Sequence, residues 1–210
     1  MKTWRAGFRQ GLGRAFRAVA MAAVLPAVLT ACGGGAVTTY DLSTVIPFKA
    51  SAARDGWSAG GQMAVAKPLA IQMFSGNEIL VKSAGGTISR VGGAQWVDQL
   101  PELVQTRLVQ SFENSAGLRS VFKTGAGLTS DYLLSTEIRE FYIDEARGAA
   151  VVELSVRLVA DTSGRVVRAK VFRAEYPASA GDGAAAVTGL DQALSAVMAD
   201  IVRWVTGRRR

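Results

Sequence analysis

The chain's one cysteine, Cys32, is the side chain best placed to do chemistry, because it ends the quartet Leu29-Thr30-Ala31-Cys32. This quartet has the spacing of a bacterial lipobox, in which a peptidase cleaves after a small residue and leaves the cysteine at the new N-terminus. The thiol would then carry a diacylglyceryl group and the new amine an N-acyl chain such as palmitate. We therefore predict cleavage between Ala31 and Cys32 and lipid attachment at Cys32.

The segment before this cysteine, residues 1–31, has the pattern of an export signal peptide. Five basic residues and no acidic residue accompany the apolar stretch Ala18–Leu29, which is 12 residues long and contains Pro26. A membrane-spanning helix needs about 20 apolar residues, so this stretch is too short to span. Two or three acyl chains on Cys32 would anchor the protein lastingly, because one chain alone binds a bilayer only marginally. The alternative is an uncleaved anchor or an ordinary secretory signal with an unmodified cysteine.

Side chains for catalysis or metal binding are scarce in the rest of the chain. Histidine is absent and the one thiol is assigned to lipid, which excludes a Ser/His/Asp triad and zinc sites built from imidazole or thiolate. No glycine-rich phosphate loop of the Walker type occurs. Glu137 and Glu140 are close in sequence, as are Asp144 and Glu145, but Glu137 and Glu140 point to opposite faces of a strand. We expect no enzymatic activity, no metal and no cofactor apart from the covalent lipid.

The charge balance argues against nucleic-acid binding. The whole chain carries +7, with 24 basic and 17 acidic residues, but five of the basic residues lie in the expected signal, so residues 32–210 carry 19 minus 17, or +2. Three of the remaining cations form a basic tail at 208–210, for which solvent contact is expected. We predict a signal peptide at 1–31, a flexible tether at 32–36 and one domain at 37–207.

Two amphipathic helices are expected. The first runs over Leu100–Asn114, with Pro101 in its opening turn, and its apolar stripe consists of Leu100, Val104, Leu108 and Phe112, whereas Gln105, Arg107, Gln110 and Glu113 lie away from it. The second begins near Asp182 and ends before Gly207. Its stripe consists of Val187, Leu190, Leu194, Val197, Ile201 and Trp204. Packing in the core is the simpler use of the second stripe, and contact with a partner helix is the alternative.

Period-two alternation and turn residues predict the strands. These are Val37–Leu42, Lys67–Phe74, a hairpin of Glu78–Lys82 with Thr87–Val91, and the long segments Asp131–Asp144, Ala149–Asp161 and Arg165–Tyr176. The segment 43–64, which includes the glycine-rich Ser51–Ala64, is expected to be an exposed loop. Together the elements predict an α/β (α+β) fold: a single domain with a mostly antiparallel sheet of about six to seven strands and two main helices packed on it.

Two of the long strands change phase. Phe141 and Ile143 fall on the face opposite to Leu134 and Ile138, and the third long strand changes likewise. An inserted residue is needed for such a change, so we predict bulges near Arg139–Glu140 and near Val171–Phe172. The alternative is that these strand ends are covered on both faces, by a helix or by another subunit.

Four residues are candidate anchors for the core or for a partner: Trp96, Pro101, Phe141 and Trp204. We class Trp96 first as a core residue, because a buried indole commonly braces the entry to a helix.

The order of several local strings resembles a known family. These strings are the lipobox, Val37-Thr38-Thr39-Tyr40-Asp41-Leu42, Gln95-Trp96-Val97-Asp98-Gln99-Leu100-Pro101, Ser111-Phe112-Glu113, Asp131-Tyr132-Leu133-Leu134, Glu137-Ile138-Arg139-Glu140-Phe141 and a last helix closing on Trp204. Together they resemble the ABC-type transport auxiliary lipoproteins, the family of paraquat-inducible protein C, over nearly all of residues 32–210. The glycine-rich Ser51–Ala64 matches no feature of the family.

The resemblance implies a non-catalytic, lipid-anchored periplasmic component of an intermembrane lipid transport system. Its partners would be a mammalian-cell-entry domain subunit, a permease and a separate ATPase, and a homo-oligomer is one option. Gly33, rather than aspartate, follows Cys32. This favours the outer membrane over retention at the inner membrane. The alternative function is a structural or assembly lipoprotein for an outer-membrane barrel or a secretion apparatus.

Overall fold

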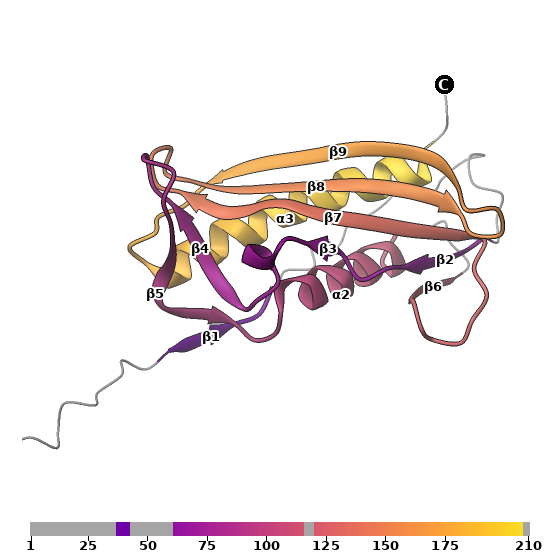
Figure 1. Ribbon diagram of the computed structural model, residues 1–210, viewed down its shortest axis with the longest axis horizontal. Coiled ribbons are helices and arrows are strands. Elements are labelled where there is room, and N and C mark those ends of the chain that lie inside the picture. The colour runs from indigo at the N-terminus through magenta and orange to yellow at the C-terminus, as the bar shows by residue number, and fades with distance from the viewer. Residues whose placement is uncertain (1–36, 43–60, 116–119, 208–210) are drawn as a thin grey trace, which may run out of the picture. The chain divides into compact units, whose positions relative to one another are not determined.

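The computed structural model describes residues 37–42, 61–115 and 120–207 (Figure 1). The chain divides into Met1–Ala36 and Val37–Arg210, and all the described residues belong to the second unit. The predicted cleavage site at Ala31 and Cys32, the 32–36 tether, most of the expected loop 43–64 and the tail 208–210 lie outside the described residues.

Three long antiparallel strands form one side of the sheet, and the last of them is an edge strand. They are β7 (Tyr132–Asp144), β8 (Ala149–Ala160) and β9 (Arg165–Pro177), as the sequence predicts. Gly148 and Gly164 take left-handed φ values of 60° and 65° in the two connecting turns, where side chains are disfavoured. The alternating apolar residues of β8, such as Val152, Leu154 and Val156, are buried, which explains why this strand is the most readable in the sequence.

The other edge of β7 is shared by three short parallel strands. β2 (Gln62–Val65) pairs with its beginning, β3 (Leu69–Ala70) with its middle and β4 (Glu78–Lys82) with its end. Beyond them, β6 (Ser120–Lys123) adds to β2, β5 (Ile88–Trp96) pairs antiparallel with β4, and β1 (Thr38–Tyr40) adds parallel to β5. The result is a single nine-stranded mixed sheet.

The α/β (α+β) class and the β4–β5 hairpin are confirmed, but the strand count is higher than predicted. The long ladders are antiparallel, yet five of the eight strand pairings are parallel. Gln62–Val65, partly placed in the expected loop, and Ser120–Lys123 are strands of four residues, too short for a periodic signal. The expected strand Lys67–Phe74 is wrong in its second half, where Gln72–Phe74 forms a 3-10 helix, η2, anchored by the buried Phe74.

Helix α3 (Gly183–Thr206) runs along β8 and β9 (Figure 1). The Asp182 carboxylate caps it by accepting a hydrogen bond of 2.9 Å from the Ala184 N–H, as predicted. By length and composition α3 is the one described helix that could cross a membrane, but 56% of its most apolar window is buried against the domain. The stripe therefore packs in the core.

Helix α2 (Leu100–Glu113) lies beside α3 and contacts β6 and β2. Its predicted stripe, from Leu100 to Phe112, is buried. The prediction that Gln105 and Arg107 lie away from the core is wrong: both are buried, because α3 and β2 flank the helix on two sides. The Gln105 side-chain amide donates a hydrogen bond of 2.9 Å to the Val65 carbonyl.

One predicted bulge is confirmed and the other is wrong. The β7–β8 register shifts between Ile138 and Glu140, at the predicted place. The β8–β9 register shifts opposite Leu158 and Val159, near the start of β9, and not at Val171–Phe172. Phe172 is buried towards α3, whereas Val171 is exposed on the opposite face of the strand. The apolar pattern of β9 changes face here because this edge strand carries an exposed apolar residue on its open face, and no residue is inserted.

Candidate functional site

Three of the four candidate anchors are buried, and two of them, Trp96 and Phe141, contact each other. Trp96 closes β5, Pro101 lies in the first turn of α2, and Phe141 follows the bulge in β7; all three are buried. The Trp96 and Phe141 rings contact edge to face, with 6.1 Å between centroids and 79° between planes. The Trp96 indole N–H is buried without a hydrogen-bond partner in the described chain. These residues brace the helix entry and present no surface to a partner.

The loop Gly76–Asn77 connects this cluster to the start of α2. The Trp96 N–H donates to the Asn77 carbonyl at 2.8 Å, and the Leu100 N–H donates to the Gly76 carbonyl at 2.9 Å. Helix α2 therefore begins at a position fixed by backbone hydrogen bonds, since no side chain caps its N-terminus.

Trp204, the fourth candidate, is half-buried at the end of α3. Its ring meets Phe172 of β9 edge to face, with 5.5 Å between centroids. The Arg168 guanidinium lies 5.6 Å from the Trp204 ring centroid and donates a hydrogen bond of 2.6 Å to the Trp204 carbonyl. A cation at the C-terminus of a helix is favourable, so Arg168 fastens α3 to the edge strand β9.

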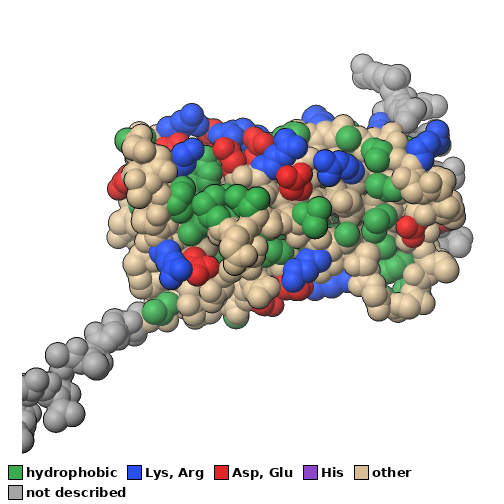
Figure 2. Space-filling model, in the orientation of Figure 1, with side chains coloured by type: hydrophobic (Ala, Val, Ile, Leu, Met, Phe, Trp, Pro, Cys, Tyr) green, Lys and Arg blue, Asp and Glu red, His purple; other side chains and the backbone are tan. Residues whose placement is uncertain are grey.

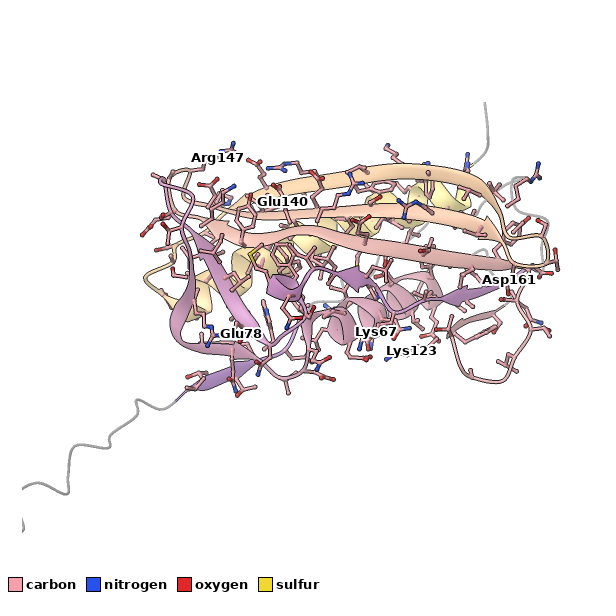
Figure 3. All side chains as sticks on the ribbon, in the orientation of Figure 1. Lys67, Glu78, Lys123, Glu140, Arg147 and Asp161 are labelled. Carbon is pink, nitrogen blue, oxygen red and sulfur yellow. The ribbon has the colours of Figure 1, made fainter. Side chains whose placement is uncertain are left out.

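The open face of β7, β8 and β9 carries a lattice of opposite charges (Figures 2 and 3). Arg173 of β9 contacts Glu140 of β7, and its guanidinium lies 3.1 Å from the Glu153 carboxylate and 3.0 Å from that of Glu175. Arg147 adds a contact of 3.1 Å to Glu175, and Figure 3 shows it near Glu140 at the same end of the sheet. The carboxylates near Glu140 are thus paired with arginines rather than directed together into a cleft.

The same contacts shift the pKa values of two groups at this end of the lattice, Tyr142 and Arg173. The Tyr142 hydroxyl donates a hydrogen bond of 3.0 Å to Glu140. Burial, and then this hydrogen bond and the charge of Glu140, raise the pKa of Tyr142 to about 12. Burial lowers the pKa of Arg173, but its hydrogen bonds with Glu175 and Glu153 outweigh burial and raise it above the ordinary value. At neutral pH Tyr142 therefore stays neutral and Arg173 stays positively charged.

Sequence reasoning missed a buried ion pair between the two helices. Arg107 of α2 and Asp191 of α3 lie 3.6 Å apart, and both are buried. The signal that could have found it is the single carboxylate beside the apolar stripe of α3, between Leu190 and Leu194. Among the described residues no group of three or more histidine, cysteine or acidic side chains could hold a metal ion.

Sequence reasoning also missed a cavity of about 470 Å³ between η2 and the β4–β5 hairpin. Met73, Leu80 and Ile88 supply apolar walls, and Glu78 and Arg90 supply charge. Its walls come from three separate elements, so no local pattern predicts it.

Comparison with known proteins identifies the family of this fold. The family model of the ABC-type transport auxiliary lipoprotein component matches residues 40–202. The chain belongs to this family. The match begins in β1 and ends in α3, so it covers nearly the whole described domain, and the resemblance stated from the sequence is confirmed.

Relatives of known sequence or structure agree with this family assignment. An uncharacterized protein of Bradyrhizobium diazoefficiens is 32% identical over 178 residues, which are 82% of this chain and 46% of that protein. The chain thus spans just under half the length of this relative. A crystal structure of a protein from Xanthomonas campestris is 28% identical and covers 80% of this chain and 94% of that chain, with a TM-score of 0.68. Another crystal structure, of an uncharacterized protein, is 16% identical with a TM-score of 0.60, covers 81% of this chain and 99% of that one, and supports the fold alone.

The family is described as the auxiliary lipoprotein component of ABC-type transport, which associates the chain with the lipoproteins of the cell envelope.

Proposed function

We propose that this protein is a lipid-anchored, non-catalytic docking subunit of an intermembrane lipid transport system that contains a mammalian-cell-entry domain subunit. The family match over residues 40–202 carries the proposal, because it covers nearly the whole described domain rather than a single motif. Lipid on Cys32 would hold the domain at the outer membrane, facing the periplasm. The two or three acyl chains of that lipid are enough for lasting attachment.

Docking surfaces are available on the sheet. β9 is 13 residues long and pairs only with β8 among the described strands, so one of its edges is open to partners. Val166 and Val171 are exposed on this strand, and Val171 is two residues from Arg173 of the charge lattice. A long edge strand is a template for pairing with another chain, either a transporter subunit or a second copy of this protein.

Two measurements test the proposal. Mass spectrometry of the purified full-length chain should find a diacylglyceryl and an N-acyl group on Cys32, and Cys32→Ser should release the protein from outer-membrane fractions. An unmodified Cys32, or normal outer-membrane fractionation of Cys32→Ser, would contradict the anchor.

The partners can be captured by crosslinking in intact envelopes. A photo-crosslinking residue at the exposed Gln192 or Asp200 of α3, or at the exposed Val171 of β9, should recover a mammalian-cell-entry subunit. The same residue at Gly85, in the exposed turn of the β4–β5 hairpin, is the position control. Recovery of only outer-membrane barrel proteins would instead favour an assembly lipoprotein.

A further inference from the structure

The cavity between η2 and the β4–β5 hairpin lies at an interruption of the sheet. β3 pairs with β7 as far as Ile138, and β4 begins to pair with β7 only at Ile143. In the described chain no strand pairs with this edge of β7 between those two residues, and η2 connects β3 to β4. The volume of about 470 Å³ is within the range of small-molecule binding sites.

A single acid and a single base lie in the cavity wall. Glu78 of β4 and Arg90 of β5 form an ion pair of 3.1 Å, at the place where the β4–β5 register shifts. A Cβ on Gly76 would overlap the Glu78 carboxylate, so glycine at this position lets the carboxylate lie against the backbone. Figure 3 shows Glu78 at the end of the domain where β4 and β5 lie. The Arg90 side chain is 73% exposed and therefore open to a ligand.

Exposed apolar side chains precede the cavity wall in the chain. Leu69 and Ile71 lie within three residues of the lining residue Gln72, and they are 63% and 59% exposed. Ile88, in the opposite wall, is also exposed. Figure 2 shows hydrophobic side chains gathered over the part of the domain where Figure 1 places β3, η2 and β4. Aliphatic groups clustered at a concave surface are typical of a binding site.

The two charged side chains of the cavity wall indicate which charges the ligand carries. An exposed ion pair contributes little to stability, so Glu78 and Arg90 can separate to contact a ligand that carries both charges. An anion alone would leave Glu78 without a partner, and a cation alone would leave Arg90 without one. Arginine suits a phosphate because its guanidinium donates two parallel hydrogen bonds, and a carboxylate suits an ammonium group that has N–H donors. Quaternary ammonium groups favour aromatic faces, and no aromatic ring lines this cavity.

We propose that this cavity binds a zwitterionic phospholipid of the ethanolamine type, with its phosphate on Arg90, its primary ammonium on Glu78 and its upper acyl carbons against Leu69, Ile71 and Ile88. This proposal rests on the proposed function, because the lipid anchor would bring the domain to a membrane. It deepens that function, because the subunit itself would bind lipid. It also explains why large aliphatic side chains are exposed beside a charged pair.

The test uses the full-length chain, purified in a non-ionic detergent and titrated with dihexanoyl lipids below their micellar concentration, with native mass spectrometry as the readout. Dihexanoylphosphatidylethanolamine should bind at least tenfold more tightly than the phosphatidylglycerol and phosphatidylcholine analogues. O-phosphoethanolamine, which has the headgroup and no chains, should bind at least tenfold more weakly. Equal binding of the glycerol or choline lipid, or of O-phosphoethanolamine, would overturn the proposal.

Variants assign the contacts. Arg90→Gln should weaken binding of both the ethanolamine and the glycerol lipid tenfold, whereas Glu78→Gln should weaken only the ethanolamine lipid. Gly76→Ala should weaken it about fivefold by displacing the carboxylate without changing charge. Glu102→Gln removes an exposed ion pair of 2.8 Å with Lys67 outside the cavity and is the matched control, which should bind as wild type. Wild-type binding by Glu78→Gln or Arg90→Gln would also overturn the proposal.

The two proposals can fail separately. Selective ethanolamine-lipid binding with no mammalian-cell-entry subunit in the crosslinking experiment would keep the lipid site and reject the transport assignment. Recovery of that subunit without selective lipid binding would keep the docking role and reject the lipid site.

Discussion

Arg107 of α2 and Asp191 of α3 form an ion pair buried between the two helices, with 3.6 Å between Nη2 and Oδ1 and each side chain only 9% exposed. Arg107 also donates a hydrogen bond of 3.4 Å to Gln110, whereas Asp191 Oδ1 accepts no hydrogen bond from a described residue. Removing two charges from water costs free energy that one long contact offsets only in part. We therefore expect the pair to add little net stability.

Breaking the pair from one side should be costly. Asp191→Leu leaves the Arg107 charge buried without its partner, so we expect the free energy of unfolding to fall by about 3–5 kcal/mol. The double variant Arg107→Met/Asp191→Leu removes both charges and should unfold at a urea concentration close to wild type. Asp200→Asn, at the exposed pair with Arg203, is the control and should change stability by less than about 1 kcal/mol. A double variant as unstable as the single one would contradict this account.

The Trp96–Phe141 contact predicts a second stability change. Phe141→Ala removes a fully buried ring from beside the start of α2 and should lower the free energy of unfolding by about 3–5 kcal/mol. The near-ultraviolet circular dichroism of the tryptophans should weaken at the same time, because Trp96 loses its edge-to-face neighbour. Val171→Ala, on the exposed face of β9, should leave both the signal and the unfolding midpoint nearly unchanged. Equal losses from the two substitutions would show that Phe141 is not an anchor.

The elements with regular periodicity were predictable from the sequence. The apolar stripe from Leu100 to Phe112 gives α2 within one residue of its observed end, and the alternation in β8 gives that strand within one residue. The bulge before Phe141 was predictable because a change of face within a strand requires an inserted residue. In each case the pattern is local, so the sequence alone contains the information.

Features that depend on distant residues were not predictable. Four-residue strands such as β2 exist because β7 offers an open edge, and nothing within Gln62–Val65 indicates that partner. The burial of Arg107 depends on α3, about 80 residues further along the chain. The cavity beside Glu78 needs η2, β4 and β5 together, so its residues show no shared motif.

Gly189 predicts a substitution effect opposite to the usual one. Alanine normally stabilises a helix interior relative to glycine by about 1 kcal/mol. A Cβ at Gly189 would lie 2.6 Å from the Ala178 Cβ and 3.0 Å from the Pro177 carbonyl oxygen, so α3 could not stay in place. We expect Gly189→Ala to lower the melting temperature and Ala178→Gly to restore part of the loss. Gly85→Ala, which meets no atom within 4 Å, is the control, and a raised melting temperature for Gly189→Ala would contradict the close approach.

Tyr142 predicts how stability changes in alkaline solution. Its pKa is raised from the ordinary value of 10.0 to about 12 by burial and by the hydrogen bond and charge of Glu140. Between these two values an unfolded chain has lost the tyrosine proton and the folded chain still holds it, so the folded state binds more protons. The stabilisation is complete below pH 10 and is lost as the pH rises through 12, which amounts to about 3 kcal/mol for a shift of two pKa units.

Urea unfolding of wild type and Tyr142→Phe between pH 9 and 12 measures this change. The titration of lysines and of the other tyrosines cancels in the difference between the two proteins. Tyr142→Phe should be less stable than wild type by a constant amount below pH 10, because Glu140 loses its hydrogen bond, and the gap should close as the pH rises. Tyr176→Phe, at an exposed tyrosine, should follow wild type throughout. A stability difference between wild type and Tyr142→Phe that stays constant across this pH range would contradict this prediction. It would show that Glu140 does not raise the pKa of the Tyr142 hydroxyl.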